Sequence, residues 1–331
     1  MRIAFVISSS FCVAPYNGIR AQAQIWAEEL TRQGHEVVKV NPWDRQEWES
    51  YDAIHLFGYN SMLGCLGRIN NKNIILSPII DSFKPIWAYR LATIWGCDKL
   101  RLSSRNHEFR KSKPYIRKWC VRTQCEADYV HRGYDVPLED IITIPLSYRF
   151  SPVASNPPKK NYCLHVSNIT AERKNVMRLI DAAIKYKFKL VLAGSADACF
   201  KDSAMKKKID SNENIKYIGR VSDEKLKELY SAAKVFALPS IGEGVGLVAL
   251  DAAVHGCDIV VTSIGGPKEY YDGLAFEVDP YSVDSIGNAV MSALSATDRQ
   301  PRLMRHVVDS YGLPQCMHKL ADSYLTGIFN G

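Results

Sequence analysis

The chain repeats one pattern along almost its whole length: short apolar runs of strand length alternate with stretches of helical periodicity. Strands joined through helices pair in parallel with right-handed crossovers, so this alternation predicts an α/β fold. At 331 residues the chain is too long for one ordinary core and suits two domains. The segment 151–160, SPVASNPPKK, has three prolines and no periodicity, which is typical of a linker between domains.

We therefore predict two doubly wound, Rossmann-like domains that face a central cleft. The predicted ranges are 1–152 for the first domain, 153–160 for the linker, 161–310 for the second domain and 311–331 for a C-terminal helix that can pack back on the first domain. Ligands of such folds bind at the carboxyl edges of the strands. The expected strands are Arg2–Ser8, Glu36–Asn41, Ala53–Phe57, Asn73–Ile80, Cys120–Thr123, Ile141–Pro145, Tyr162–Ser167, Lys189–Gly194, Lys216–Ile218, Val235–Pro239 and Asp258–Thr262.

Composition excludes several classes of protein. Hydrophobic residues make up 47% and charged residues 23%, which is enough apolar surface to exclude disorder as the main state. The sequence has no run of 18 apolar residues, so we expect no membrane-spanning helix. The nine cysteines are scattered, without a CxxC pair or zinc spacing, and we expect a reduced, cytoplasmic setting without a metal site.

The net charge of +7 is concentrated in one segment, Lys99–Arg122, which holds nine cations and one acid. Its cations are interleaved with Phe109, Tyr115, Ile116 and Trp119, a pattern that favours peripheral docking to an anionic membrane surface. A solvated basic helix face would give the same pattern. We expect no nucleic-acid partner, because no RNA- or DNA-binding motif occurs.

The most informative stretch begins at Phe236: FALPSIGEGVGLVALDAAVHGCDIVVTSIGGPKE. A strand ends at Pro239, a glycine-rich loop holds Glu243, and a helix begins near Leu247. Backbone N–H groups at such a helix start favour anions, whereas an acid in the loop favours hydroxyls or cations. The alternative is a tight turn in which Glu243 complements the helix dipole and Asp251 lies on the surface.

This stretch resembles the signature PSxxEGxGLxxLEAxxxGxPVVxSxxGGxxE of the retaining glycosyltransferases of family 4, which have the GT-B fold. The resemblance implies that Glu243 contacts the donor sugar and that Asp251 accepts hydrogen bonds from the ribose hydroxyls. Asp251 stands where the family has a second glutamate, one methylene longer. The backbone amides of Gly244, Val245, Gly246 and Leu247 would line the sugar and diphosphate.

A second similar stretch is LHVSNITAERKN, Leu164–Asn175, in which Asn168 stands where the family has an arginine. Departure of a nucleoside diphosphate leaves negative charge on the bridging oxygen, and fixed cations stabilise that charge without a metal. Lys174 is the predicted catalytic cation, and Arg173 can replace the missing arginine. The alternative is that both are solvated charges in a first helical turn.

Further positions match the family more loosely. Gly194 ends LVLAG, and Arg220 ends KYIGR as a candidate stacking partner for the base. In the first domain, Gly18 and Arg20 resemble the glycine loop that faces the donor phosphates. Asp81 stands where the family commonly has a histidine, and it can orient or deprotonate the acceptor hydroxyl or simply cap a helix. His55 lies within a strand, where a hydrogen-bonded core histidine is the better interpretation.

These observations predict a retaining transferase that moves a sugar from a UDP- or GDP-sugar to a hydroxyl of a glycan or lipid-linked acceptor. Its setting would be cell-surface polysaccharide or glycolipid synthesis, at the cytoplasmic face of the membrane, and no cofactor would be required. One alternative is an NAD-dependent oxidoreductase, because Gly244, Gly246 and Ala249 form G-x-G-x-x-A between a strand and a helix. The other is an inactive nucleotide-sugar-binding protein, which the substitutions at Asn168 and Asp251 leave open.

Overall fold

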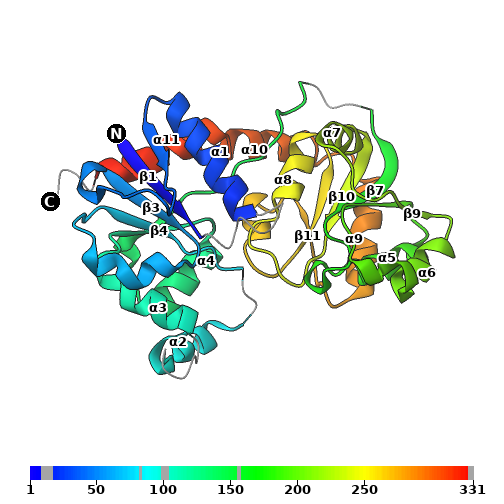
Figure 1. Cartoon of the computed structure of the whole chain (residues 1–331). Helices are drawn as coiled ribbons and strands as arrows, with labels where there is room; N and C mark the ends of the chain where they lie inside the picture. Colours follow the sequence, from blue (N-terminus) through cyan, green and yellow to red (C-terminus); the bar gives the residue numbers. More distant parts are fainter. Residues whose placement is uncertain (9–17, 82–83, 98–103, 155–157, 327–331) are drawn as a thin grey trace. The chain divides into compact units, whose positions relative to one another are not determined.

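The computed structural model describes residues 1–8, 18–81, 84–97, 104–154 and 158–326. They form two compact units (Figure 1). Unit 1 comprises the described residues of 1–80, 84–146 and 313–331, and unit 2 comprises those of 147–312 together with Asp81. Each unit contains a six-stranded sheet whose strands, in the part of the chain that the structure describes, all pair in parallel, which confirms the predicted α/β class.

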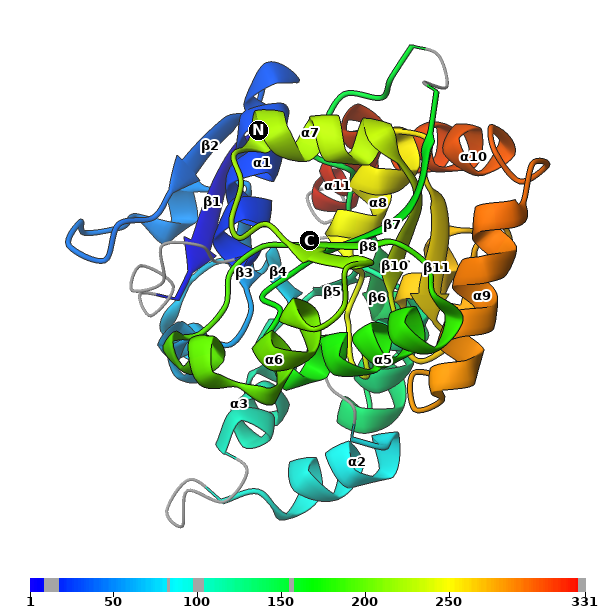
Figure 2. The ribbon, with the colours of Figure 1, turned by 90° about the vertical axis from the view of Figure 1, so that its right-hand side faces the viewer.

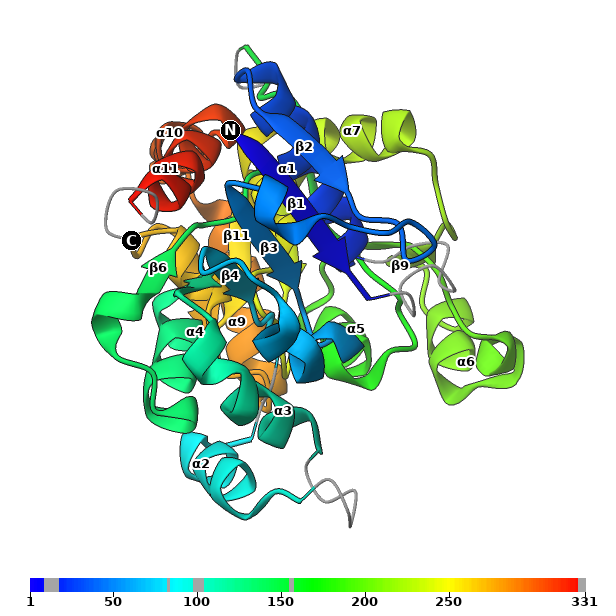
Figure 3. The same ribbon diagram turned by 60° about the vertical axis from the view of Figure 1, so that its left-hand side comes forward.

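The first sheet has the order β2-β1-β3-β4-β5-β6. Its strands are β1 (Arg2–Ile7), β2 (Glu36–Lys39), β3 (Ala53–Phe57), β4 (Ile74–Ser77), β5 (Lys118–Val121) and β6 (Ile141–Thr143). Its helices are α1 (Gly18–Arg32), α2 (Ile86–Trp95), α3 (Ser104–Ser112), α4 (Gln124–Asp128) and α11 (Leu313–Leu325). Figure 3 shows β1 to β4 side by side.

Alternation along the strands divides the core of unit 1 between the two faces of the sheet. On β3, Ile54 and Leu56 join the cluster that includes Phe109 of α3. His55 and Phe57, which alternate with them, contact Trp26 of α1. The His55 ring also hydrogen-bonds Tyr324 Oη at 2.6 Å and Ser77 Oγ at 2.8 Å. The prediction of a hydrogen-bonded core histidine is confirmed, and burial lowers the pKa of His55 to about 3.

Helix α11 lies in unit 1, although residues 147–312 of unit 2 separate it in sequence from the rest of that unit. The backbone carbonyl of its Tyr324 accepts a hydrogen bond from Asn73 Nδ2 at 3.0 Å. The carbonyl of Ser323 accepts from Arg117 Nη2 at 2.6 Å. The chain enters unit 2 between Leu146 and Ser147, earlier than the predicted boundary at 152, because Arg149 and Val153 are already bonded to a helix of unit 2.

The basic segment differs from its prediction in one respect. Phe109, Ile116 and Trp119 are buried in the core of unit 1, so the expectation that they line a membrane interface is wrong. Phe109 lies on α3 and Trp119 on β5, and both side chains, with that of Ile116, belong to one buried cluster. Tyr115 alone of the four predicted residues is exposed. Residues 99–103 of the segment lie outside the described residues, as do residues 9–17 before α1. No helix in the described ranges has the length and apolar character needed to cross a membrane.

The second sheet has the order β12-β11-β10-β7-β8-β9. Its strands are β7 (Lys160–Val166), β8 (Leu190–Ala193), β9 (Ile215–Tyr217), β10 (Ala233–Leu238), β11 (Asp258–Thr262) and β12 (Phe276–Val278). Its α-helices are α5 (Val176–Tyr186), α6 (Ala204–Asp210), α7 (Asp223–Ala232), α8 (Leu247–Val254), α9 (Val283–Ser295) and α10 (Arg302–Ser310). In Figure 2, α5 and α9 lie together along one face of the sheet, where their apolar residues form one buried cluster.

This strand order places a topological switch point inside unit 2. From β7 the chain proceeds outward to β8 and β9, then returns to the other side of β7 and continues through β10, β11 and β12. The carboxyl ends of β7 and β10 therefore lie next to each other, with helices leaving to opposite sides. In open α/β sheets the crevice at such a point is the usual ligand position.

Candidate active site in unit 2

The two motifs singled out in the sequence follow the two strands of the switch point. Parallel pairing of β7 with β10 brings the loop after Val166 beside the loop after Leu238. The first loop carries Arg173 and Lys174 in a short 3₁₀ turn, Glu172–Lys174, and the second carries Glu243. Residues separated by about seventy positions thus share one sheet edge because β7 and β10 are neighbours.

Asn175 fastens the first loop to the second. It has a left-handed backbone, φ 60°, which asparagine tolerates better than most residues. Its side-chain amide donates to the carbonyls of Pro239 at 2.9 Å and Pro280 at 2.6 Å, and its side-chain oxygen accepts from Arg178 at 2.8 Å. The N–H of Ile241 donates to the carbonyl of Arg173 at 2.9 Å. These bonds fix the backbone that presents the cations.

Lys174 and Glu243 form an ion pair at the centre of this edge. Lys174 Nζ contacts Glu243 Oε2, and Arg173 Nη1 lies 3.6 Å from the same oxygen. The side chains of Lys174 and Glu243 are only 12% and 13% exposed, whereas that of Arg173 is 49% exposed. Two cations face one carboxylate, so the local charge is positive and suits an anionic ligand.

Glycines allow close packing of the loop that carries Glu243, between β10 and α8. Gly246, just before α8, has φ +80°, and a Cβ there would lie 2.7 Å from Leu238 Cδ2. At Gly265, with φ +81°, a Cβ would lie 3.2 Å from the carbonyl oxygen of Glu243. Gly244 and Val245 complete the loop, Val245 being buried, and Leu247 begins α8. The predicted donor-lining amides therefore lie directly beside Glu243.

His165 lies beneath the site and was not singled out in the sequence. Its ring is fully buried, and burial lowers its pKa to about 4, so the ring is neutral near pH 7. Because a carbonyl can only accept, Nδ1 donates to Ala237 of β10 at 2.8 Å. The unprotonated Nε2 then accepts from the Ser167 hydroxyl at 2.7 Å. In the sequence, the signal that could have indicated this contact was a histidine at the next-to-last position of a central strand.

Asn168 and Gly194 shape the side of the site next to β8. Asn168 is exposed, accepts from Thr170 Oγ1 at 2.8 Å and donates to Asp197 Oδ1 at 3.3 Å, so it organises the loop. Gly194 follows β8, and its N–H donates to the carbonyl of Gly219 at 2.8 Å. Arg220, exposed, is next to Gly219 after β9. Four parallel strands thus bring the predicted donor positions of unit 2 to one edge.

Asp251 requires a correction. Its side chain is completely buried, with Oδ1 accepting from the backbone N–H of Arg149 at 2.7 Å and Oδ2 from Arg149 Nε at 2.8 Å and Nη2 at 2.7 Å. Burial raises the pKa of Asp251, and the Arg149 guanidinium opposes that rise. Both carboxylate oxygens are therefore occupied within the protein, and the predicted contact with ribose hydroxyls does not fit this arrangement. Sequence reasoning missed Arg149, which lies 102 positions away.

The remaining predicted residues belong to other parts of the chain. Gly18 and Arg20 lie in the first turn of α1, in unit 1. Asp81 is exposed and follows β4. Gly18 and Arg20 thus belong to a different unit from Lys174 and Glu243, whereas Asp81 is grouped with unit 2, and the predicted roles of all three stay predictions. In the described ranges, no three His, Cys, Asp or Glu side chains are grouped as metal ligands would be.

We expect Arg149→Met to lower the free energy of unfolding by about 3 kcal/mol, because it leaves the Asp251 carboxylate buried without its counter-charge. The folded-state pKa of Asp251 should then lie further above its unfolded value, so stability falls as pH rises through that interval. Urea unfolding should accordingly show a smaller loss near pH 5 than near pH 7. Lys206→Met, which breaks an exposed pair with Asp210, is the control and should cost less than about 0.5 kcal/mol. Equal losses in both variants would contradict the structural role of Asp251.

Comparison with known proteins identifies the domain that holds this site. Residues 149–306 match the family described as Glycosyl transferases group 1. The O-antigen chain mannosyltransferase B of Escherichia coli is 25% identical over 204 residues, covering 59% of this chain and 49% of that protein. The chain spans about half or less of the length of the first curated relatives that it matches.

Solved structures agree on the fold over the full length. Sucrose-phosphate synthase from Thermosynechococcus elongatus superposes with a TM-score of 0.76 at 17% identity, covering 100% of both chains. Anabaena HepE in complex with UDP superposes with a TM-score of 0.72 at 15% identity, covering 98% of this chain and 100% of that one. At these identities the likeness establishes the fold. Gly244, Gly246 and Ala249 lie within the range of the family match, which favours a glycosyltransferase domain over a dinucleotide-binding one.

Proposed function

From the premise that this chain carries a glycosyl transferases group 1 domain, a domain of glycosyltransferase enzymes, we propose that it transfers a sugar from a nucleotide-diphosphate sugar to an acceptor hydroxyl. The acceptor is a glycan or a lipid-linked sugar, and the setting is the synthesis of cell-surface polysaccharide or glycolipid. The observation that carries the proposal is the contact of Lys174 with Glu243 at the switch point of unit 2. The name of the Escherichia coli relative, which concerns O-antigen, supports the setting.

In this proposal the cations act on the leaving group. The bond from the anomeric carbon to the diphosphate oxygen breaks, and the charge that develops on that oxygen is stabilised by Lys174 and Arg173. The acceptor oxygen forms the new bond and its proton passes to the departing diphosphate. Fixed lysine and arginine charges supply the electrostatic stabilisation, so the proposal requires no metal or other cofactor.

Glu243 has two tasks in the same proposal. Its Oε2 contacts Lys174 Nζ and lies 3.5 Å from the Ser240 hydroxyl, which fixes the carboxylate. Its other oxygen can accept hydrogen bonds from hydroxyls of the donor sugar. We propose attack on the face from which the diphosphate leaves, with retention of anomeric configuration, and anomeric analysis of the product by NMR tests that point.

Donor hydrolysis is the most direct test of the proposed activity. We expect the purified chain to release nucleoside diphosphate slowly from one sugar nucleotide in a panel that includes UDP-glucose and GDP-mannose. The UDP in the HepE complex and the mannosyl transfer in the relative's name motivate these two probes. Tight binding of one donor without turnover, with any acceptor, would instead favour an inactive sugar-nucleotide-binding protein. Binding of NADH in place of sugar nucleotides would contradict both.

A further inference from the structure

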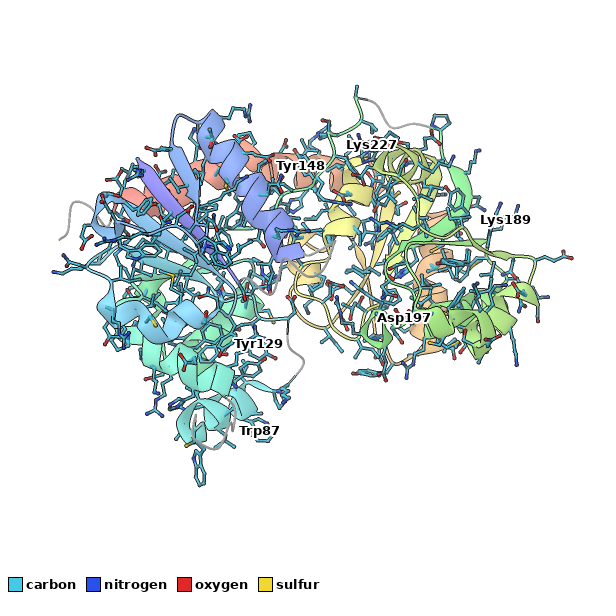
Figure 4. All side chains as sticks on the ribbon, in the orientation of Figure 1. Trp87, Tyr129, Tyr148, Lys189, Asp197 and Lys227 are labelled. Atoms are coloured by element: carbon cyan, nitrogen blue, oxygen red, sulfur yellow. The ribbon has the colours of Figure 1, made fainter. Side chains whose placement is uncertain are left out.

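Helix α2 of unit 1 presents an apolar face to solvent. Four large side chains of this ten-residue helix are exposed: Trp87 at 65%, Leu91 at 48%, Ile94 at 51% and Trp95 at 74%. At about 100° per residue, these four positions fall within one arc of about 100° on the helix surface. Figure 4 shows Trp87 projecting away from the ribbon. Burying such side chains is favourable, so a face of this kind indicates an interaction site.

The opposite face holds α2 firmly in unit 1. Tyr89 packs edge-to-face against Tyr129 and Tyr134, with ring centroids 5.0 and 6.1 Å apart. Thr93 is buried, and Arg110 of α3 donates to the carbonyls of Thr93 and Ile94 at 3.2 Å each. The helix is thus anchored by its polar and aromatic side, and its exposed apolar arc is a fixed feature of the surface.

Positive charge borders this arc. Helices α2 and α3 together carry four cations, Arg90, Arg105, Arg110 and Lys111, against one acid, Glu108. All four cations are exposed. Arg90 and Arg110 also line an open cavity of about 660 Å³ beside Ile94, together with Lys113, while Asp135 and Asp140 line its other part. An apolar arc bordered by cations fits a partner that is apolar inside and anionic at its surface.

We propose that α2 docks in the plane of an anionic lipid bilayer. Trp87, Leu91, Ile94 and Trp95 enter the boundary between headgroups and acyl chains, where the amphipathic indole ring is favoured. Arg90, Arg110 and Lys111 meet the lipid phosphates. The aromatic residues at the membrane interface are therefore Trp87 and Trp95 of α2. They take the role that the sequence analysis gave to Phe109 and Trp119, which are buried. The docking proposal does not depend on the proposed reaction. If both hold, docking brings the enzyme to a lipid-linked acceptor.

Vesicle co-sedimentation of the full chain tests this surface. We expect binding to phosphatidylcholine vesicles that contain phosphatidylglycerol, weaker binding as salt is raised, and little binding to phosphatidylcholine alone. The double variant Trp87→Gln, Trp95→Gln should bind at least about tenfold more weakly. Arg90→Gln should weaken binding about fivefold, and only to the anionic vesicles. Trp43→Gln is the matched control, since Trp43 is 93% exposed in unit 1 but outside α2, and it should stay within about twofold of the parent.

Several results would overturn the proposal. These are no binding by the parent chain, equal binding by the double variant, or equal binding to neutral and anionic vesicles. Self-association in the ultracentrifuge that the double variant abolishes would identify α2 as a contact between copies instead. Donor hydrolysis by the double variant in solution should match the parent. Loss of vesicle binding with hydrolysis intact therefore separates this proposal from failure of the proposed reaction.

Discussion

Replacing Lys174 with methionine is expected to lower donor turnover at least about a hundredfold. The reason is that Lys174 is the less exposed of the two cations at the site and is held by Glu243, so its charge is fixed before the diphosphate departs. Methionine retains most of the side-chain volume and removes the charge. The measurement is the rate of nucleoside diphosphate release at saturating donor, with donor affinity followed separately.

Glu243→Gln should cause a loss of similar size, because it removes the negative charge that pairs with Lys174 and turns one of the two acceptor oxygens into an amide donor. Effects of two groups that act as a unit are strongly non-additive, so the double variant should be little slower than either single variant. Lys225→Met is the matched control: it breaks an exposed lysine–glutamate pair, with Glu228, in the same unit and should leave the rate unchanged. Near-parent rates in both Lys174→Met and Glu243→Gln would refute the assignment of this edge as the catalytic site.

Gly194→Ala is expected to destabilise unit 2 by at least about 3 kcal/mol. Gly194 has φ +122°, a conformation that side chains rarely adopt, and an alanine Cβ would lie 1.8 Å from the carbonyl oxygen of Ser167. That oxygen belongs to the backbone at the end of β7, so it cannot move without disturbing the strand and the loop after it. Urea unfolding followed by circular dichroism would measure the shift in midpoint.

Gly273→Ala separates the two causes of that loss. Gly273 has φ +72°, but a Cβ there would meet nothing within 4 Å. Backbone strain alone should cost about 1–2 kcal/mol, and the difference between the two variants reports the steric clash at Gly194. Equal midpoints for the two variants would show that the loop after β7 relaxes freely, and the tight packing described at this edge would then be incorrect.

The strands were largely predictable because their apolar runs are short, buried and bounded by polar residues. The predicted ranges Ala53–Phe57 and Asp258–Thr262 coincide with β3 and β11. Strand β12 was missed, since three residues between a turn at Gly273 and an aspartate give no periodic signal. The alternation predicted helical stretches between the strands without giving bounds for α2, and its apolar arc would have been expected to be buried, because the apolar face of a helix usually is.

The candidate site was predictable where the evidence was local. The resemblance of one loop to the family signature indicated Glu243, and the similar stretch 164–175 indicated Lys174 as a cation at the start of a helix. Arg149 was not predictable, because only the tertiary fold brings it to Asp251 from 102 positions away. The same holds for the bonds from Asn175 to Pro239 and Pro280, which depend on how three separate loops meet.

A ribosome releases α11 only after it has synthesised all of unit 2. Until then His55 lacks the Tyr324 hydroxyl, and Asn73 and Arg117 lack the carbonyls of α11 that they bind in the finished protein. Unit 2 is nearly continuous in sequence and can close its core during translation, whereas unit 1 completes these contacts only after residues 313–325 have been synthesised. Unit 1 is therefore expected to depend on chaperones until α11 is available, and a premature stop before residue 313 should send unit 1 to proteolysis.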